Sequence, residues 1–121
     1  MKNKTTRRAG FTLVEIMIVV AIIGLLATVA VPNFVRARKT AQKNACISNL
    51  QQLDGAKQLW ATENRKGETE VPGEDDVRVY IKNERMPVCP GSGTYQILAV
   101  NVDPECTKKG DGHNLASLSA Q

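Results

Sequence analysis

The sequence predicts an α+β protein in which one long N-terminal helix carries a small antiparallel hairpin region on its C-terminal half. Residues 11–35 form a run of twenty-five residues with Glu15 as the only charge, and strong helix formers follow without a turn signal. Clusters of turn residues and alternating apolar residues appear only from Gly67 onward. With 121 residues in total, the chain has room for one small domain.

The basic excess of the chain is confined to its N-terminal tip. Sixteen Lys and Arg oppose twelve Asp and Glu, and Lys2, Lys4, Arg7 and Arg8 account for the whole difference. A nucleic-acid-binding protein keeps a basic surface on its folded part. We therefore expect no nucleic-acid partner.

The apolar run 11–35 is long enough to cross a bilayer, which takes ~20 residues. The basic cluster before it predicts a cytoplasmic N-terminus and an external C-terminal part, although Arg36 and Arg38 just beyond the run weaken that orientation. A removable secretory signal has a shorter core of ~7–15 residues. A simple anchor would not carry Glu15, since a charge at mid-membrane costs ~2.5–3.5 kcal/mol or more.

Cleavage between Gly10 and Phe11 would explain Glu15. No Lys, Arg or His lies between Phe11 and Val35, so the uncut segment offers the carboxylate no cation. A new α-amino group at Phe11, with a pKa near ~8, would be largely protonated. Glu15 would lie about one helical turn from that amine, in the same subunit or a staggered neighbour. This pattern predicts a docking role for Glu15.

Residues 7–15, RRAGFTLVE, resemble the cleavage and methylation motif of type IV prepilins and type II secretion pseudopilins, and the whole of 7–35 fits that family. The resemblance implies that a prepilin peptidase cuts after Gly10 and methylates the amine of Phe11. It also implies that Glu15 serves recruitment into a helical filament of identical subunits, through an inner-membrane assembly machinery.

Gly24 and Pro32 match the helix-weakening positions of the family's membrane segment. Physically, Gly costs a helix ~1 kcal/mol relative to Ala, and Pro32 cannot donate to the carbonyl of Thr28. Either a functionally silent kink or a segment that loosens in the filament is consistent with these residues. A third alternative is two helices broken at Pro32.

Residues 36–64 continue the helix as an amphipathic segment, giving a helix from about Phe11 to about Asn64, ~80 Å long. The predicted stop is Gly67. Apolar residues recur on one face and polar ones on the other. The apolar face comprises Cys46, Leu50, Leu53 and Trp60, and the polar face Asn44, Gln51, Gln58 and Lys66.

Residues 65–121 form a small globular region with a thin core, because large apolar residues are few. After the acidic loop 67–76, the segment 77–81 fits a short helix slightly better than a strand. The best strand is Thr94–Val100, and a second around Glu105–Lys108 completes a hairpin. A third strand is expected after Gly112.

Cys89 and Cys106 flank this hairpin, and outside the cytoplasm a disulfide between them is the favoured pairing. A disulfide that closes a loop of this length would stabilise the fold by ~3 kcal/mol. Cys46, on the apolar helix face, could pair with either, but is expected to be a buried thiol. The resemblance supports a C-terminal disulfide, because many pilins have one. Calcium-binding members of that family raise a second hypothesis, in which Asp103 and Asp111 are calcium ligands. The residues themselves favour solvated turns over a calcium site, because their spacing matches no known calcium loop.

No cofactor, metal site or enzymatic activity is expected. Cys89, Cys106 and His113, the only histidine, lack the CxxC or HxxxH spacing of zinc sites. A nucleophilic site would have only His113 to serve as a base beside Cys89.

The sequence therefore predicts a leader over 1–10, a transmembrane and assembly helix over 11–35, its amphipathic continuation over 36–64 and a globular region over 65–121. The predicted function is that of a structural filament subunit, processed by prepilin peptidase. It would begin as a single-pass inner-membrane precursor with a cytoplasmic N-terminus and end in a periplasmic or extracellular filament. Pilus and secretion pseudopilus stay open. The alternative is a membrane-anchored extracytoplasmic binding or redox module that does not polymerise.

Overall fold

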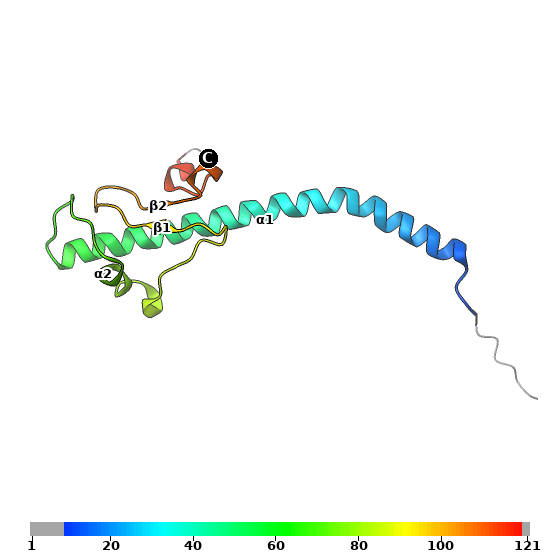
Figure 1. Ribbon diagram of the computed structural model, residues 1–121, viewed down its shortest axis with the longest axis horizontal. Coiled ribbons are helices and arrows are strands. Elements are labelled where there is room, and N and C mark those ends of the chain that lie inside the picture. Colours follow the sequence, from blue (N-terminus) through cyan, green and yellow to red (C-terminus); the bar gives the residue numbers. More distant parts are fainter. Residues whose placement is uncertain (1–8, 120–121) are drawn as a thin grey trace, which may run out of the picture. The chain divides into compact units, whose positions relative to one another are not determined.

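The computed structural model describes residues 9–119. Helix α1 (Leu13–Glu63) is followed by short helical turns and a two-stranded antiparallel sheet, which confirms the predicted α+β fold (Figure 1). The chain divides into two compact units, with the boundary between Arg36 and Ala37. Most of the predicted leader 1–10 lies outside the described residues.

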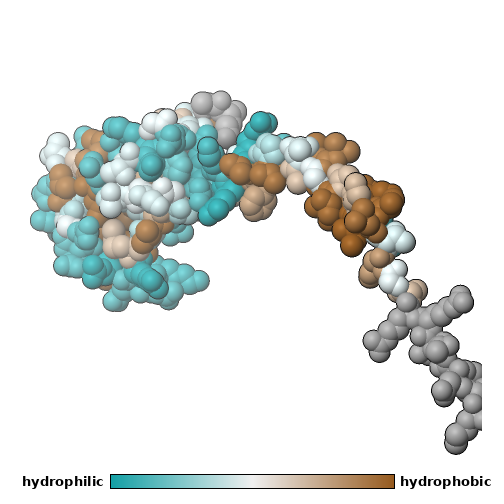
Figure 2. All heavy atoms as spheres, turned by 45° about the vertical axis from the view of Figure 1, so that its right-hand side comes forward, coloured by the Kyte–Doolittle hydropathy of each residue, from teal (hydrophilic) through white to brown (hydrophobic). Residues whose placement is uncertain are grey.

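The first unit contains the apolar part of α1. The helix runs without interruption through Gly24 and Pro32, so the alternative of two helices broken at Pro32 is wrong. Between these two residues the Thr28 hydroxyl donates to the carbonyl of Leu25 over 2.7 Å. The apolar side chains of this segment are exposed in the single chain, as the brown surface in Figure 2 shows. This helix meets the length and hydropathy that a membrane span requires.

The C-terminal end of α1 is set by a left-handed residue other than glycine. Arg65 has a φ of 53°, and the N–H of Lys66 donates to the carbonyl of Ala61 over 2.9 Å. This is the six-to-one bond of a Schellman motif, which normally has Gly at the left-handed position. The prediction that Gly67 stops the helix is therefore wrong by two residues.

The second unit is built on the predicted apolar face of α1. Cys46, Leu50, Leu53 and Trp60 are all buried, as the period of the sequence indicated. The three N-terminal members of this face belong to one core cluster with residues from the rest of the unit, namely Ala56, Val77, Ile81, Cys89 and Cys106. Trp60, Ala61 and Val100 form a smaller cluster nearby.

A short helix, α2 (Glu74–Arg78), is present as the sequence favoured, but it begins three residues before the predicted segment 77–81, inside the predicted loop 67–76. The Asp76 carboxylate accepts the N–H of Gly73 over 3.0 Å and so caps the first turn. Val77 points into the core and is fully buried. A 3-10 turn, η1 (Lys82–Glu84), follows.

The predicted hairpin is present but shorter than expected. Strands β1 (Tyr95–Gln96) and β2 (Glu105–Cys106) pair Tyr95 with Cys106 and Gln96 with Glu105. The first strand does not extend to Val100, because the backbone there bonds elsewhere. The Val100 carbonyl accepts from the Gln58 side chain over 3.0 Å, and its N–H donates to the Glu70 carbonyl over 3.1 Å.

The expected third strand after Gly112 is wrong. Two 3-10 turns occupy this end of the unit, η2 (Lys109–Asp111) and η3 (Leu115–Leu118). The Asn114 side chain caps the second turn by accepting the N–H of Ser117 over 2.8 Å. An Asn that bonds its own backbone competes with a strand ladder, which explains the helical outcome.

Candidate functional site

The predicted cleavage point lies in exposed backbone before α1. Gly10 and Phe11 precede the helix, and Phe11 is 89% exposed. A Cβ added at Gly10 would have no atom within 4 Å. The glycine is therefore not required by packing within the described chain.

Glu15 has a local partner that the sequence analysis missed. Its Oε2 accepts the N–H of Thr12 over 3.2 Å, and the Thr12 hydroxyl accepts the N–H of Glu15 over 3.3 Å. This reciprocal pair is a capping box, for which the T-x-x-E spacing of residues 12–15 is the sequence signal. The carboxylate also lies at the positive end of the helix dipole. Glu15 is thus held beside Phe11, in a shallow hollow that Phe11, Ile16, Val19 and Val20 also line.

A second candidate site lies in the core of the other unit. The Sγ atoms of Cys46, Cys89 and Cys106 and a ring nitrogen of His113 all lie within 4.8 Å of one another. Cys46 comes from α1, Cys89 from the loop before β1, Cys106 from β2 and His113 from the segment after η2. All four side chains are buried, and His113 is the most exposed at 7%.

The electrostatic environment differs between two of these thiols. Burial raises the pKa of the Cys46 thiol to about 12, against a hydrogen bond with Tyr95 that lowers it. Burial also raises the pKa of Cys89, but hydrogen bonds from the backbone N–H groups of Gly93 and Gly91, together with bonds to His113 and Cys46, outweigh this effect. The pKa of Cys89 is therefore lowered to about 7. The loop after Cys89 therefore favours a thiolate there.

The structure brings together the three residues that the sequence analysis considered for zinc and adds Cys46. All three cysteines are free thiols in the structure, so the Cys89–Cys106 disulfide stays a prediction. The spacing rules missed the cluster because its four members are spread over residues 46–113. Within residues 9–119, Asp103 and Asp111 belong to no group of this kind, and the calcium hypothesis gains no support.

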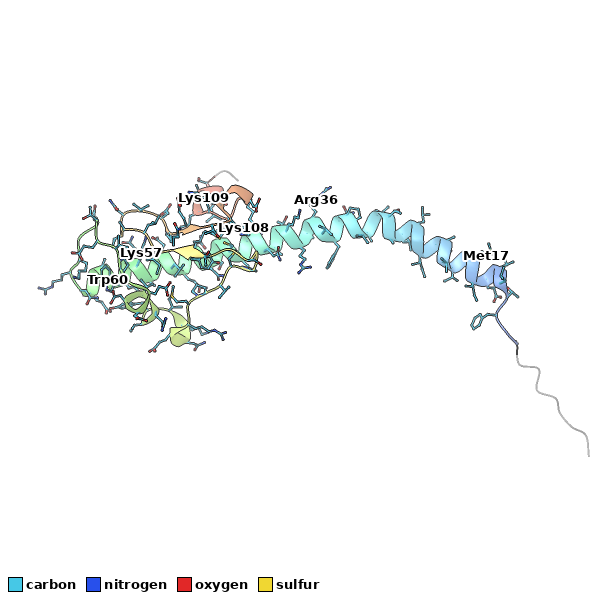
Figure 3. The ribbon with its side chains drawn as sticks, in the orientation of Figure 1. Met17, Arg36, Lys57, Trp60, Lys108 and Lys109 are labelled. Carbon is cyan, nitrogen blue, oxygen red and sulfur yellow. The ribbon has the colours of Figure 1, made fainter. Side chains whose placement is uncertain are left out.

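One further polar residue was missed entirely. Lys57 on α1, labelled in Figure 3, is fully buried, and burial lowers its pKa. Its ammonium donates to the carbonyls of Ala99, over 2.9 Å, and Val102, and lies 3.9 Å from Asp54. A lysine within a helical pattern carries no signal that it will be buried.

Comparison with known proteins agrees with the N-terminal motif and extends beyond it. The family described as "Prokaryotic N-terminal methylation motif" matches residues 5–31. The type II secretion system core protein G of Klebsiella pneumoniae is 32% identical over 106 residues, which cover 77% of this chain and 76% of the relative. Core protein G of Dickeya chrysanthemi is 34% identical, covering 77% and 69%.

The similarity to a pilin is higher in identity but shorter. The type IV major pilin PilA of Myxococcus xanthus is 44% identical over 57 residues, 47% of this chain and 26% of the relative. No solved structure matches the chain at a significant level.

The long apolar helix, the methylation motif and the small α+β region define a protein of the pilin class. Within that class, the chain belongs to the family of type II secretion system core protein G, the pseudopilins. It is accordingly a structural subunit of a pilin-like filament.

Proposed function

We propose that the chain is a subunit of a type II secretion pseudopilus, made as an inner-membrane precursor and cut between Gly10 and Phe11 by a prepilin peptidase. The observation that carries this proposal is the exposed apolar surface of residues 13–35, with a single carboxylate at the end next to the cut. Such a surface needs lipid or neighbouring helices around it. A filament core made of these helices would satisfy that need after the subunit leaves the bilayer.

The secretion filament is favoured over a pilus by the extent of the similarity. The core protein G relatives of Klebsiella pneumoniae and Dickeya chrysanthemi match across 77% of the chain, whereas the Myxococcus pilin matches 47%. The N-terminal motif is common to both groups, so the remainder of the chain discriminates. The basic cluster before the apolar run supports a precursor with its N-terminus in the cytoplasm. A secretion filament would then stand in the periplasm.

Glu15 is proposed to bind the Phe11 amine of an adjacent subunit. Within residues 9–119, its Oε2 is the oxygen that accepts a hydrogen bond, from Thr12, which leaves Oε1 for an amine. Removing one partner of a buried ion pair costs ~3–5 kcal/mol. At 1.4 kcal/mol per factor of ten, assembly would weaken by ~100-fold or more.

The capping box dictates how this proposal is tested, since Glu15 has a structural role besides the docking role. Glu15→Gln keeps an oxygen that can accept the Thr12 N–H but removes the charge, whereas Glu15→Leu removes both. We expect both variants to be inserted and cleaved but absent from filaments. Electron microscopy of sheared filaments, with membrane fractionation of the same cells, measures both properties, and the exposed Glu68→Gln serves as control.

Normal filaments from Glu15→Gln, with none from Glu15→Leu, would mean that helix capping rather than charge is required. Normal filaments from both would remove Glu15 from the assembly mechanism.

Processing is read by mass spectrometry of the same samples. The mature chain should begin with Phe11 and carry one methyl group. Gly10→Leu should block cleavage, because a branched side chain would enter the peptidase site. Gly67→Leu is the matched control, since an added Cβ meets nothing within 4 Å at either glycine. An intact leader in membranes with active peptidase would contradict the proposed processing.

A further inference from the structure

Three thiols and one imidazole converge in the second unit, and the proposed filament role uses none of them. Cys46, Cys89, Cys106 and His113 place their ligand atoms within 4.8 Å of one another. In the part of the chain that the structure describes, no other group of three or more His, Cys, Asp or Glu side chains is gathered in this way. These four are also all buried, which solvated surface groups are not.

We propose that this cluster is a structural Zn²⁺ site of the Cys₃His type. Tetrahedral zinc binds thiolate at ~2.3 Å and imidazole at ~2.0–2.1 Å, so its ligand atoms stand roughly 3.5–3.8 Å apart. The Sγ of Cys89 lies 3.5 Å from Nδ1 of His113, which is already this spacing. The other pairs, all within 4.8 Å, need shifts of only about 1 Å to close on an ion.

Backbone and side-chain donors surround the sulfurs as they do at metal sites. The N–H groups of Gly91 and Gly93 donate to Cys89, and the N–H of Lys108 donates to the Sγ of Cys106 over 3.5 Å. A hydrogen bond also joins Tyr95 to Cys46. Such donors stabilise thiolate ligands and fix their orientation. Each sulfur of the cluster thus has a second partner besides its neighbours.

The two glycines allow the backbone to approach the cluster. A Cβ at Gly93 would lie 2.6 Å from the Sγ of Cys106, and one at Gly91 would lie 2.9 Å from Cε1 of His113. Only glycine fits at either place without moving a ligand. The loop from Cys89 to Gly93 is therefore shaped around the four ligands.

The charge around the cluster suits an anionic site. Zn²⁺ with three thiolates and a neutral imidazole carries one net negative charge. His113 lines a pocket of about 420 Å³ together with Lys39, Lys43, Lys108 and Asp111, so cations outnumber the acid there. The same pocket connects His113 with solvent and provides a path for the ion.

A disulfide explains fewer of the groups. A disulfide joins two sulfurs at ~2.05 Å. It does not explain why the third thiol and His113 are buried beside them. A Cys89–His113 nucleophilic pair would need access for a substrate, yet Cys89 is 3% exposed. A closed site with four protein ligands matches structural zinc, because a catalytic zinc keeps one position open. The ion would join α1, the loop before β1, β2 and the end of the chain.

The test uses full-length protein purified from membranes in detergent. Elemental analysis should find one zinc per chain. Exchange with Co²⁺ should give the intense visible bands of tetrahedral cobalt and the near-ultraviolet thiolate-to-cobalt charge-transfer band. Chelation of the zinc should lower Tm, because binding energy at such a site is folding energy.

Variants identify the ligands. Cys46→Ser, Cys106→Ser and His113→Asn should each lose the zinc and the cobalt spectrum. His113→Cys should retain zinc and shift the cobalt spectrum to that of an all-sulfur site, so ligand loss is distinguished from misfolding. Asp111→Asn, in the adjoining pocket, should keep full zinc content.

Three results would overturn the proposal. The first is wild-type protein without zinc and with one titratable thiol after denaturation, which identifies a disulfide. The second is zinc retained by both Cys46→Ser and His113→Asn, which identifies adventitious metal. The third is a wild-type cobalt spectrum without tetrahedral and thiolate bands.

Discussion

Lys57 is the residue at which local sequence pattern and final environment differ most. It lies on the buried side of α1, and its ammonium holds the carbonyls of Ala99 and Val102. The same segment of chain is held by the side chain of Gln58. These bonds turn the backbone at residues 99–102 to the helix instead of to β2.

We expect Lys57→Met to lower the free energy of unfolding by ~1.5–3 kcal/mol, the cost of losing hydrogen bonds to a charged group and leaving buried carbonyls unpaired. Urea unfolding followed by the fluorescence of Trp60, the only tryptophan, measures this change. Lys109→Met removes an exposed pair with Glu105 and is the control, with an expected change below ~1 kcal/mol. Equal losses in the two variants would mean that burial of Lys57 contributes nothing.

At the scale of elements, the extent of α1 was predicted from about Phe11 to about Asn64, but the residues that begin and end it were not. The capping box of Thr12 and Glu15 opens it, and the left-handed Arg65 closes it. A residue with a Cβ in that conformation costs roughly 1–2 kcal/mol. Glycine at this position would relieve the strain. It would also increase the conformational entropy of the unfolded chain, which lowers stability by ~0.4–1 kcal/mol.

Arg65→Gly should therefore raise the free energy of unfolding by ~0.5–1 kcal/mol. Arg65→Ala removes the same charge but keeps the Cβ, and it should give no gain. Urea unfolding of the two variants beside the wild type measures the difference. A gain as large in Arg65→Ala would assign the effect to charge and not to backbone conformation.

At the scale of the whole molecule, most of the exposed large apolar residues belong to the first unit, and the buried ones belong to the second. We expect residues 36–121 to be soluble and monomeric, with an intact core on the C-terminal part of α1. Analytical ultracentrifugation and circular dichroism check the mass and the helix content. Aggregation comparable to that of the full chain would show that assembly does not depend on residues 11–35 alone.

The sequence by itself determined the parts of this protein that rest on local chemistry. The membrane helix follows from an uninterrupted apolar run, the buried face of α1 from a helical period, and the family from the contiguous motif at 7–15. The length of the first strand was overestimated, because residues 94–100 alternate in hydrophobicity as a strand does. Alternation does not show that backbone carbonyls of this segment accept hydrogen bonds from the side chains of Lys57 and Gln58. The prediction of a third strand failed for a similar reason, because the side chain of Asn114 accepts a hydrogen bond from the backbone of its own segment.

Only the tertiary structure decided the cluster of Cys46, Cys89, Cys106 and His113. Each of these residues has an ordinary local setting, and no short spacing joins them. Their meeting depends on how α1, the Cys89 loop and β2 pack on one another, with Gly91 and Gly93 allowing close contact. Local pattern determines which segment is helix or membrane span, because those choices depend on neighbours in the chain. A site assembled from four separate segments depends on packing, and packing is a property of the folded chain.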